Sequence, residues 1–309
     1  MYLVYSVLMG LAAILLTPYW VTQGIRHGKY LSNLSERMGF SYPVLKTLPA
    51  ERPGAIWLHA VSVGEVLAGL TLAKRLKEAF PGKPLVISTT TITGHNLAKE
   101  RMAFADAVIY FPLDWAFCVR RALAAVNPAL VVVLETEIWP NFLREASRRK
   151  VPVIFVSGRI SDRSFARSQS WLSVAGFYLR PFLRDALGRA NGFWMQSEKD
   201  AERVKALGGP AGKVRVGGNL KYDLELPKNT PLADWLEKEL ARSGRRPLIV
   251  AGSVVANEEP LALIAFGVAQ GEYRKALLVL APRKPERFEA AATFTTAPSF
   301  EFEIGWFER

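Results

Sequence analysis

The sequence is poor in cysteine and histidine. Cys118 is the single cysteine among 309 residues, so the chain cannot form an internal disulfide, and only three histidines are present. A lone cysteine is typical of a reducing compartment. The sequence has no Cys and His cluster with the spacing of a zinc site, and no Asp-x-Asp pair to hold a divalent ion on a nucleotide sugar. We therefore expect neither a metal nor another cofactor.

Two nucleotide-binding motifs are also missing. No G-x-G-x-x-G follows an expected strand, which removes the main support for a dinucleotide oxidoreductase. The stretch "GGPAGK" at 208–213 resembles a phosphate loop, but only three residues separate Gly208 from Gly212, and Val214 stands where Ser or Thr is required. The spacing therefore excludes a P-loop.

The first 25 residues lack any charged side chain, whereas a bilayer core needs only ~20 predominantly apolar helical residues. Arg26 and Lys29 follow at once, and basic residues on that side place the remaining chain in the cytoplasm. No basic stretch precedes the apolar run, so a cleaved signal peptide fits poorly. We expect residues 1–25 to be a single N-terminal membrane anchor. A helix lying in the interface or packed on protein is the alternative.

Basic residues outnumber acidic residues. The 40 Lys and Arg residues against 28 Asp and Glu residues give a net charge of +12. Such an excess favours an anionic partner, which could be nucleic acid, a phosphate-bearing substrate or an acidic membrane. Charge alone does not choose among the three.

From residue 55 the chain alternates short β-rich runs with amphipathic helical stretches, which predicts a parallel sheet covered by helices on both faces. Strands are expected at 55–61, 84–89, 107–111, 129–134, 151–156, 192–196 and 213–217, with helices at 64–80, 115–126 and 139–149. The same alternation of strands and helices begins again after a polar, Pro-containing segment. We therefore expect a first domain at 26–222, a linker at 223–231 and a shorter second domain at 232–309.

Polar residues collect where these strands end. In a doubly wound sheet, ligands bind beyond the carboxyl ends of the strands, so this many polar strand ends on one rim indicates a site. The candidates are Ser62, Gly64, Glu65, Thr90, Glu135, Glu137, Arg159, Asn219 and Lys221 in the first half, and Gly252, Ser253 and Arg283 in the second.

Ser62 has two further interpretations. With Glu65 three residues later, it could form a capping box that merely begins a helix. The stretch Ala60 to Gly64 also approximates the nucleophile elbow of a serine hydrolase. That fold usually supplies a histidine late in the chain, whereas the last histidine here is His95. A membrane-anchored hydrolase using Ser62 is therefore the weaker hypothesis.

Eight ordered stretches resemble the 3-deoxy-D-manno-octulosonic acid (Kdo) transferases. They are "HAVSVGE", "STTTITG", "FPLD", "LETEIWPN", "VSGRISDRS", "GNLKYD", "AGS" and "APRKPERF". The resemblance implies two Rossmann-like domains of the GT-B type behind an N-terminal anchor in the inner membrane, with the body facing the cytoplasm. It also implies transfer of Kdo from CMP-Kdo to the lipid A precursor (lipid IVA) in lipopolysaccharide core biosynthesis, with inversion, without a metal and without nucleic acid as a partner.

The resemblance also assigns roles to the strand-end residues. Glu65 is implied as the general base. Ser62, Gly64, Thr90, Glu135, Glu137 and Arg159 match the acceptor side, and Asn219, Lys221, Gly252, Ser253 and Arg283 match the donor side. Family members continue past "APRKPERF" with further α/β units, which this sequence lacks. We therefore expect an incomplete second domain and weak transfer, the alternative being an inactive lipid-binding fragment.

Overall fold

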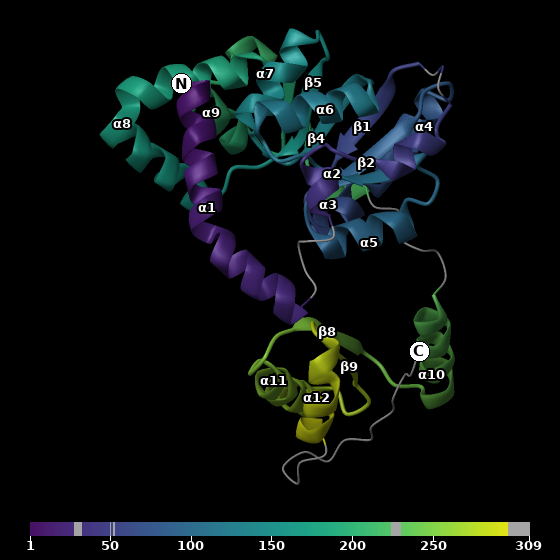
Figure 1. The fold of residues 1–309 in the computed structure, drawn as a ribbon. Helices are drawn as coiled ribbons and strands as arrows, with labels where there is room; N and C mark the ends of the chain where they lie inside the picture. Colours follow the sequence, from purple (N-terminus) through teal and green to yellow (C-terminus); the bar gives the residue numbers. More distant parts are fainter. Residues whose placement is uncertain (28–32, 50, 52, 224–229, 296–309) are drawn as a thin grey trace. The chain divides into compact units, whose positions relative to one another are not determined.

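The computed structural model describes residues 1–27, 33–49, 51, 53–223 and 230–295. The chain divides into two compact units, Met1–Glu225 and Leu226–Arg309. Figure 1 labels most of the helices and strands of both. The division falls inside the expected linker, most of which (224–229) lies outside the described residues.

Within the described residues, unit 1 is built on a seven-stranded sheet in the order β3-β2-β1-β4-β5-β6-β7, and every pairing is parallel. The order reverses between β1 and β4, which is the switch point of a doubly wound sheet. The strands are β1 (Ala55–His59), β2 (Leu85–Thr89), β3 (Ala107–Tyr110), β4 (Pro128–Leu134), β5 (Val153–Gly158), β6 (Gly192–Met195) and β7 (Val214–Val216). Each overlaps a strand expected from the sequence.

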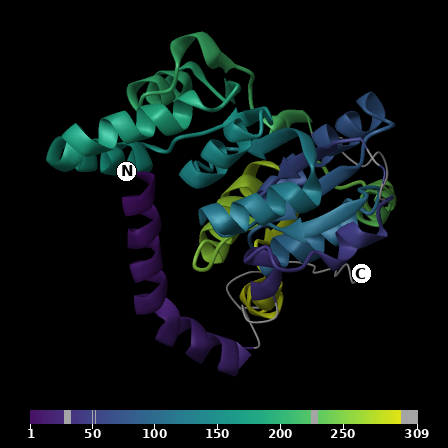
Figure 2. The same ribbon diagram turned by 45° about the horizontal axis from the view of Figure 1, so that its top comes forward.

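Helices cover both faces of this sheet (Figures 1 and 2). They are α2 (Leu34–Arg37), α3 (Val63–Ala68), α4 (Leu70–Ala79), α5 (Ile92–Arg101), α6 (Ala116–Val126), α7 (Pro140–Arg148), α8 (Asp162–Gly188) and α9 (Glu198–Ala206). The single helix expected at 64–80 is divided at Gly69. A Cβ at Gly69 would lie 2.5 Å from Cδ1 of Leu134, so glycine lets the chain pass this close to β4 without displacing that side chain.

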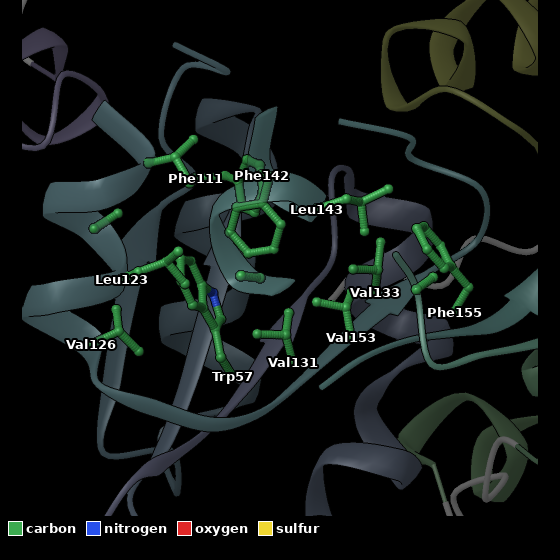
Figure 3. Close-up of a cluster of buried hydrophobic side chains, with 14 of the residues drawn as sticks. Trp57, Phe111, Leu123, Val126, Val131, Val133, Phe142, Leu143, Val153 and Phe155 are labelled. Atoms are coloured by element: carbon green, nitrogen blue, oxygen red, sulfur yellow. The ribbon is translucent and has the colours of Figure 1, made fainter. Parts of the chain in front are cut away.

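Successive side chains of the central strands point to opposite faces of the sheet, and both faces are buried. On one face, Trp57 of β1 and Val131 of β4 pack against Leu123 of α6 and Phe142 of α7 (Figure 3). The neighbouring residues of the same strands pack under α3, α4 and α5. The ring centroids of Trp57 and Phe142 lie 5.3 Å apart at 85°, an edge-to-face contact. Burial on both faces holds the strand ends in fixed register.

Helix α1 (Tyr2–His27) begins against unit 1. The Tyr2 hydroxyl donates to Asp185 at 2.7 Å, and the Tyr5 hydroxyl donates to Asp114 at 3.0 Å. Leu3 and Leu15 of the same helix are 77% and 79% exposed. None of the described helices is both long and apolar enough to cross a bilayer. Part of the expected anchor, from residue 18 onward, lies outside the residues whose side chains are described.

Across residues 230–295, unit 2 contains two parallel strands, β8 (Leu248–Val254) and β9 (Leu277–Pro282). Its helices are α10 (Pro231–Ser243), α11 (Glu259–Glu272) and α12 (Phe288–Thr295). Helix α10 begins at the last residue of the expected linker, because the Thr230 hydroxyl accepts a hydrogen bond from the Ala233 N–H at 3.1 Å and Pro231 occupies the first turn.

Candidate functional site

The candidate site lies at the carboxyl ends of β1 and β4, which are the two strands at the switch point. After β1 the chain enters α3 through Val61 and Ser62, and after β4 it runs through Glu135 and Glu137 before α7 begins. Because β1 and β4 are hydrogen-bonded neighbours, residues 74 positions apart in the sequence, such as His59 and Val133, pair at the carboxyl ends of these strands. The topology thus brings the carboxylates together.

Glu65 turns back towards the residues that precede its own helix. One carboxylate oxygen, Oε2, accepts the Val61 N–H at 2.8 Å, and the other, Oε1, accepts the Ser62 hydroxyl at 3.1 Å. The residue is only 7% exposed. Ser62 stands at the N-cap position, but its side chain accepts no capping hydrogen bond. The capping-box interpretation was therefore wrong, because the Ser62 hydroxyl donates its hydrogen bond to the Glu65 carboxylate and accepts none from the backbone of the helix.

The pKa of Glu65 is raised from an ordinary 4.5 to about 7, and burial is the largest cause. The nearby carboxylates of Glu135 and Glu137 also act to raise this pKa, whereas the hydrogen bonds from Val61 and Ser62 act to lower it. The pKa of Glu137 is itself raised, first by burial and then by Glu135. Burial therefore outweighs the two hydrogen bonds that favour the ionised form of Glu65. Glu65 can take up or release a proton near neutral pH.

Thr90 lies beside the Val61 turn. The backbone N–H groups of Thr90 and Thr91 donate to the Val61 carbonyl at 3.2 and 3.1 Å. The Thr90 hydroxyl oxygen is buried and has no hydrogen-bond partner among the described residues. A buried, unpaired hydroxyl is costly, so this group is well suited to bind a polar ligand group.

Arg37 is a site residue that the sequence argument missed. Its guanidinium donates to the Thr90 carbonyl and lies 4.7 Å from the centroid of the Tyr110 ring. It comes from α2, 53 residues before Thr90, and nothing in the local sequence links the two. Only its positive charge could have drawn attention to it.

Two residues at the rim adopt left-handed backbone conformations without being glycine. Glu135 has φ 56° and Ser157 has φ 57°. Such conformations cost on the order of 1–3 kcal/mol and cluster at functional sites. Ser157 is held by its neighbours, because its hydroxyl accepts from Gln196 Nε2 and from the Leu220 N–H, each at 3.2 Å. These bonds join the ends of β5 and β6 to the turn after β7.

Arg159 and the residues after β7 complete this rim. The Arg159 N–H donates to the Thr136 hydroxyl at 2.8 Å, which ties the segment after β5 to the segment after β4, and its side chain is exposed. The Asn219 side-chain oxygen accepts from the Lys221 N–H at 3.0 Å, leaving the Lys221 side chain exposed. Thr136 and Gln196 were not among the sequence candidates.

The remaining candidates lie in unit 2. Gly252 and Ser253 end β8, and Arg283 follows β9. The Arg283 N–H donates to the Val254 carbonyl at 2.8 Å, so these residues meet at one edge of the small sheet. Ser253 also has a left-handed backbone, with φ 59°. The donor-side candidates are thus divided, with Asn219 and Lys221 in unit 1 and these three in unit 2.

No histidine side chain described in the structure bonds to Ser62. His59 is fully buried, its Nδ1 lies 2.9 Å from the Ser88 hydroxyl, and burial lowers its pKa to about 3. The Nδ1 of His95 lies 3.4 Å from the Thr89 hydroxyl. The partner of the Ser62 hydroxyl is a carboxylate and not an imidazole, so the geometry disfavours a hydrolase triad.

Comparisons with known proteins agree on a family. The family model described as "3-Deoxy-D-manno-octulosonic-acid transferase (kdotransferase)" matches residues 32–224. The 3-deoxy-D-manno-octulosonic acid transferase of Haemophilus influenzae is 31% identical over 90% of this chain and 62% of its own length. The enzyme of that name from Bordetella pertussis is 32% identical over 79% of this chain and 55% of its own. The chain thus spans little more than half the length of these relatives.

A solved structure shares the fold. The UDP-GlcNAc 2-epimerase of Neisseria meningitidis, bound to UDP-GlcNAc, superposes with a TM-score of 0.52 at 12% identity, covering 82% of this chain and 73% of that protein. At this identity the likeness supports the α/β Rossmann-like fold and nothing about the reaction.

Proposed function

Because the chain belongs to the 3-deoxy-D-manno-octulosonic-acid (Kdo) transferase family, we propose that it is a glycosyltransferase that moves Kdo from CMP-Kdo to the lipid A precursor, lipid IVA, with inversion at the anomeric carbon. The observation that carries this proposal is Glu65, a mostly buried carboxylate of pKa about 7 at the switch point of the sheet. It supplies the base that the reaction requires.

The proton transfer follows from that geometry. As the acceptor hydroxyl oxygen bonds to the anomeric carbon of Kdo, it loses its proton to Glu65, while the bond from that carbon to the CMP phosphate breaks. A base is most effective when its pKa lies near the working pH, and it contributes typically 10²- to 10⁴-fold. The Val61 N–H and the Ser62 hydroxyl hold both oxygens of Glu65 and keep the side chain in one orientation.

The acceptor is assigned to the rim of unit 1. Gly64 leaves room there, since the nearest atom to a Cβ at this position would be the Ser62 hydroxyl at 4.0 Å. The free Thr90 hydroxyl and the carboxylates of Glu135 and Glu137 suit sugar hydroxyls, and the exposed Arg159 suits an acceptor phosphate.

The donor-side residues that we assign are Asn219 and Lys221 in unit 1 and Gly252, Ser253 and Arg283 in unit 2. CMP gains negative charge as it leaves, and an exposed basic side chain such as Lys221 or Arg283 can stabilise that charge. We place the protein at the cytoplasmic face of the inner membrane, attached through α1. The exposed Leu3 and Leu15 side chains of that helix support this assignment.

A donor comparison tests the proposed function. The whole protein is incubated with lipid IVA and with labelled CMP-Kdo or labelled UDP-GlcNAc, and the lipid product is analysed by mass spectrometry. We expect a Kdo-bearing lipid from the first donor only, with inversion at the anomeric carbon read by NMR. Label transfer from UDP-GlcNAc, or hydrolysis of CMP-Kdo without a glycolipid product, would contradict the proposal.

A further inference from the structure

A polar cavity lies at the edge of the sheet opposite to the one that carries Glu65. It has a volume of about 670 Å³, and its lining includes Lys150 to Pro152, Asn191 and Lys213. These residues immediately precede β5, β6 and β7. Because all strands are parallel, residues that precede strands lie at the amino edge, one strand length from the candidate site. A six-residue strand spans about 20 Å, so the two sites are separate.

The lining carries an excess of positive charge. Lys150, Arg184, Arg189 and Lys213 contribute four cations, and Asp185 contributes one carboxylate, which leaves a net charge of +3. Asp185 is already paired, because the Arg189 guanidinium donates to both of its oxygens, at 2.9 and 3.0 Å. This pairing lowers the pKa of Asp185 and keeps it ionised.

One of these cations, Lys213, already has hydrogen-bond partners at the C-terminus of α8. The Lys213 ammonium donates to the carbonyls of Gly188 and Ala190 at 2.9 and 2.8 Å, which is ordinary for a lysine beside a helix C-terminus. One of its three N–H groups remains for a ligand. Lys150 and Arg184, by contrast, have no side-chain hydrogen bond or ion pair to any residue that the structure describes. Both side chains are exposed and line the same cavity, so two cations without a partner in the described part of the chain are available there to an anion.

Three exposed aromatic and aliphatic side chains lie on the helices that carry lining residues or contact them. Phe177 is 85% exposed and stands seven residues before Arg184 on α8, so both lie on one stripe of that helix. Tyr178, 62% exposed, precedes Asp185 by the same interval. Helix α1 reaches the same place, since the Tyr2 hydroxyl bonds to Asp185 and the next residue, Leu3, is largely exposed. The phosphate of an amphiphile would contact the basic lining of the cavity, and its apolar part would contact these exposed side chains.

The geometry points to a second ligand site here, one that binds a phosphate group, either free or on a lipid headgroup, between Lys150, Arg184 and Lys213. The volume is within the range of about 300–1,000 Å³ typical of small-molecule sites. Charge-assisted hydrogen bonds from arginine and lysine are the ordinary means of holding phosphate. The site does not depend on the proposed transfer reaction.

Acetylation of individual lysines tests this site directly. The whole protein is treated briefly with an acetylating reagent, with or without inorganic pyrophosphate, and the modified lysines are quantified by mass spectrometry. Bound phosphate should slow the modification of Lys150 by about fivefold or more, because the ammonium is held in an ion pair. Lys74 on α4, also exposed, is the matched control and should not change.

Two variants and two vesicle preparations complete the test. Arg184→Gln should abolish the protection of Lys150 while the far-UV circular dichroism stays that of the wild type. Vesicles of phosphatidylcholine with phosphatidic acid should protect Lys150 if the phosphate is lipid-borne, and Phe177→Ser should weaken that effect. Protection by pyrophosphate alone assigns the site to free phosphates. Absence of protection by both, equal protection of Lys74, or protection that survives Arg184→Gln would overturn the inference.

Discussion

The Ser62 hydroxyl donates a 3.1 Å hydrogen bond to Oε1 of Glu65. This bond favours the ionised carboxylate, whereas the charge of Glu135 disfavours it. Two neighbours of the proposed base therefore act on its pKa in opposite directions. The pH dependence of the reaction can separate their effects.

Ser62→Ala should move the pH profile of transfer towards higher pH. The substitution removes a hydrogen bond to the ionised form, so the pKa of Glu65 rises and a larger fraction stays protonated at neutral pH. We expect the plateau rate to fall by no more than about tenfold, because the base itself remains. The rate of transfer between pH 5 and 9 measures both effects. Complete loss of transfer at every pH would favour a nucleophilic Ser62.

Glu135→Gln should move the same profile towards lower pH. Removing one negative charge beside Glu65 makes its ionisation easier, so its pKa falls. Acceptor affinity should also fall, and a separate titration with lipid IVA measures it. The exposed Glu78 on α4 provides the control, since Glu78→Gln leaves the site untouched. A profile that shifts upward in Glu135→Gln would show that the two carboxylates do not interact as described.

Glu65→Gln should stabilise the folded protein at alkaline pH. The pKa of Glu65 is about 7 when folded and near its ordinary 4.5 when unfolded, so the folded state binds the proton more tightly. The wild type therefore loses stability as pH rises from about 4.5 to 7, and Gln avoids this loss. Urea unfolding at pH 8 should show a gain of roughly 1–3 kcal/mol, and at pH 4.5 none. A gain of equal size at both pH values would contradict the raised pKa.

Asp114 should be required for the start of α7. Its carboxylate accepts the N–H groups of Asn141 and Phe142 at 3.0 and 2.7 Å, and it is almost fully buried. Asp114→Ala leaves both donors without an acceptor, which should cost about 2–3 kcal/mol in unfolding free energy. Tyr5→Phe, which removes only the bond from α1, should cost about 1 kcal/mol or less.

Hydrogen exchange distinguishes these two variants. The Asn141 and Phe142 amides should exchange faster in Asp114→Ala and at the wild-type rate in Tyr5→Phe. Unchanged exchange in Asp114→Ala would show that α7 begins without this cap.

The strands of unit 1 could be predicted to within about two residues, because apolar β-branched runs such as residues 130–134 mark buried parallel strands. The order of the strands was not predicted, and only the structure shows that β1 pairs with β4 and brings Glu65 near Glu135. The break at Gly69 was missed, and the contact that a side chain at this position would make, with Leu134, involves a residue remote in sequence.

Other features of the site depend on tertiary contacts that a single sequence does not encode locally. The left-handed backbones of Glu135 and Ser157 occur in residues that rarely adopt them, and hydrogen bonds from distant segments hold Ser157 in place. Arg37 reaches Thr90 across 53 residues. The pKa of Glu65 depends on how deeply it is buried, which only the packed structure determines.

The most direct test of the account is the rate of Kdo transfer from CMP-Kdo to lipid IVA by the wild type and by Glu65→Gln between pH 5 and 9. Protein in excess over acceptor makes slow transfer measurable. We expect the wild-type rate to rise to a plateau with an apparent pKa close to 7, as set by Glu65. The variant should bind lipid IVA normally but transfer at least about 100-fold more slowly, without that pH dependence. A variant that keeps the wild-type rate and pH profile would contradict the assignment of Glu65 as the base.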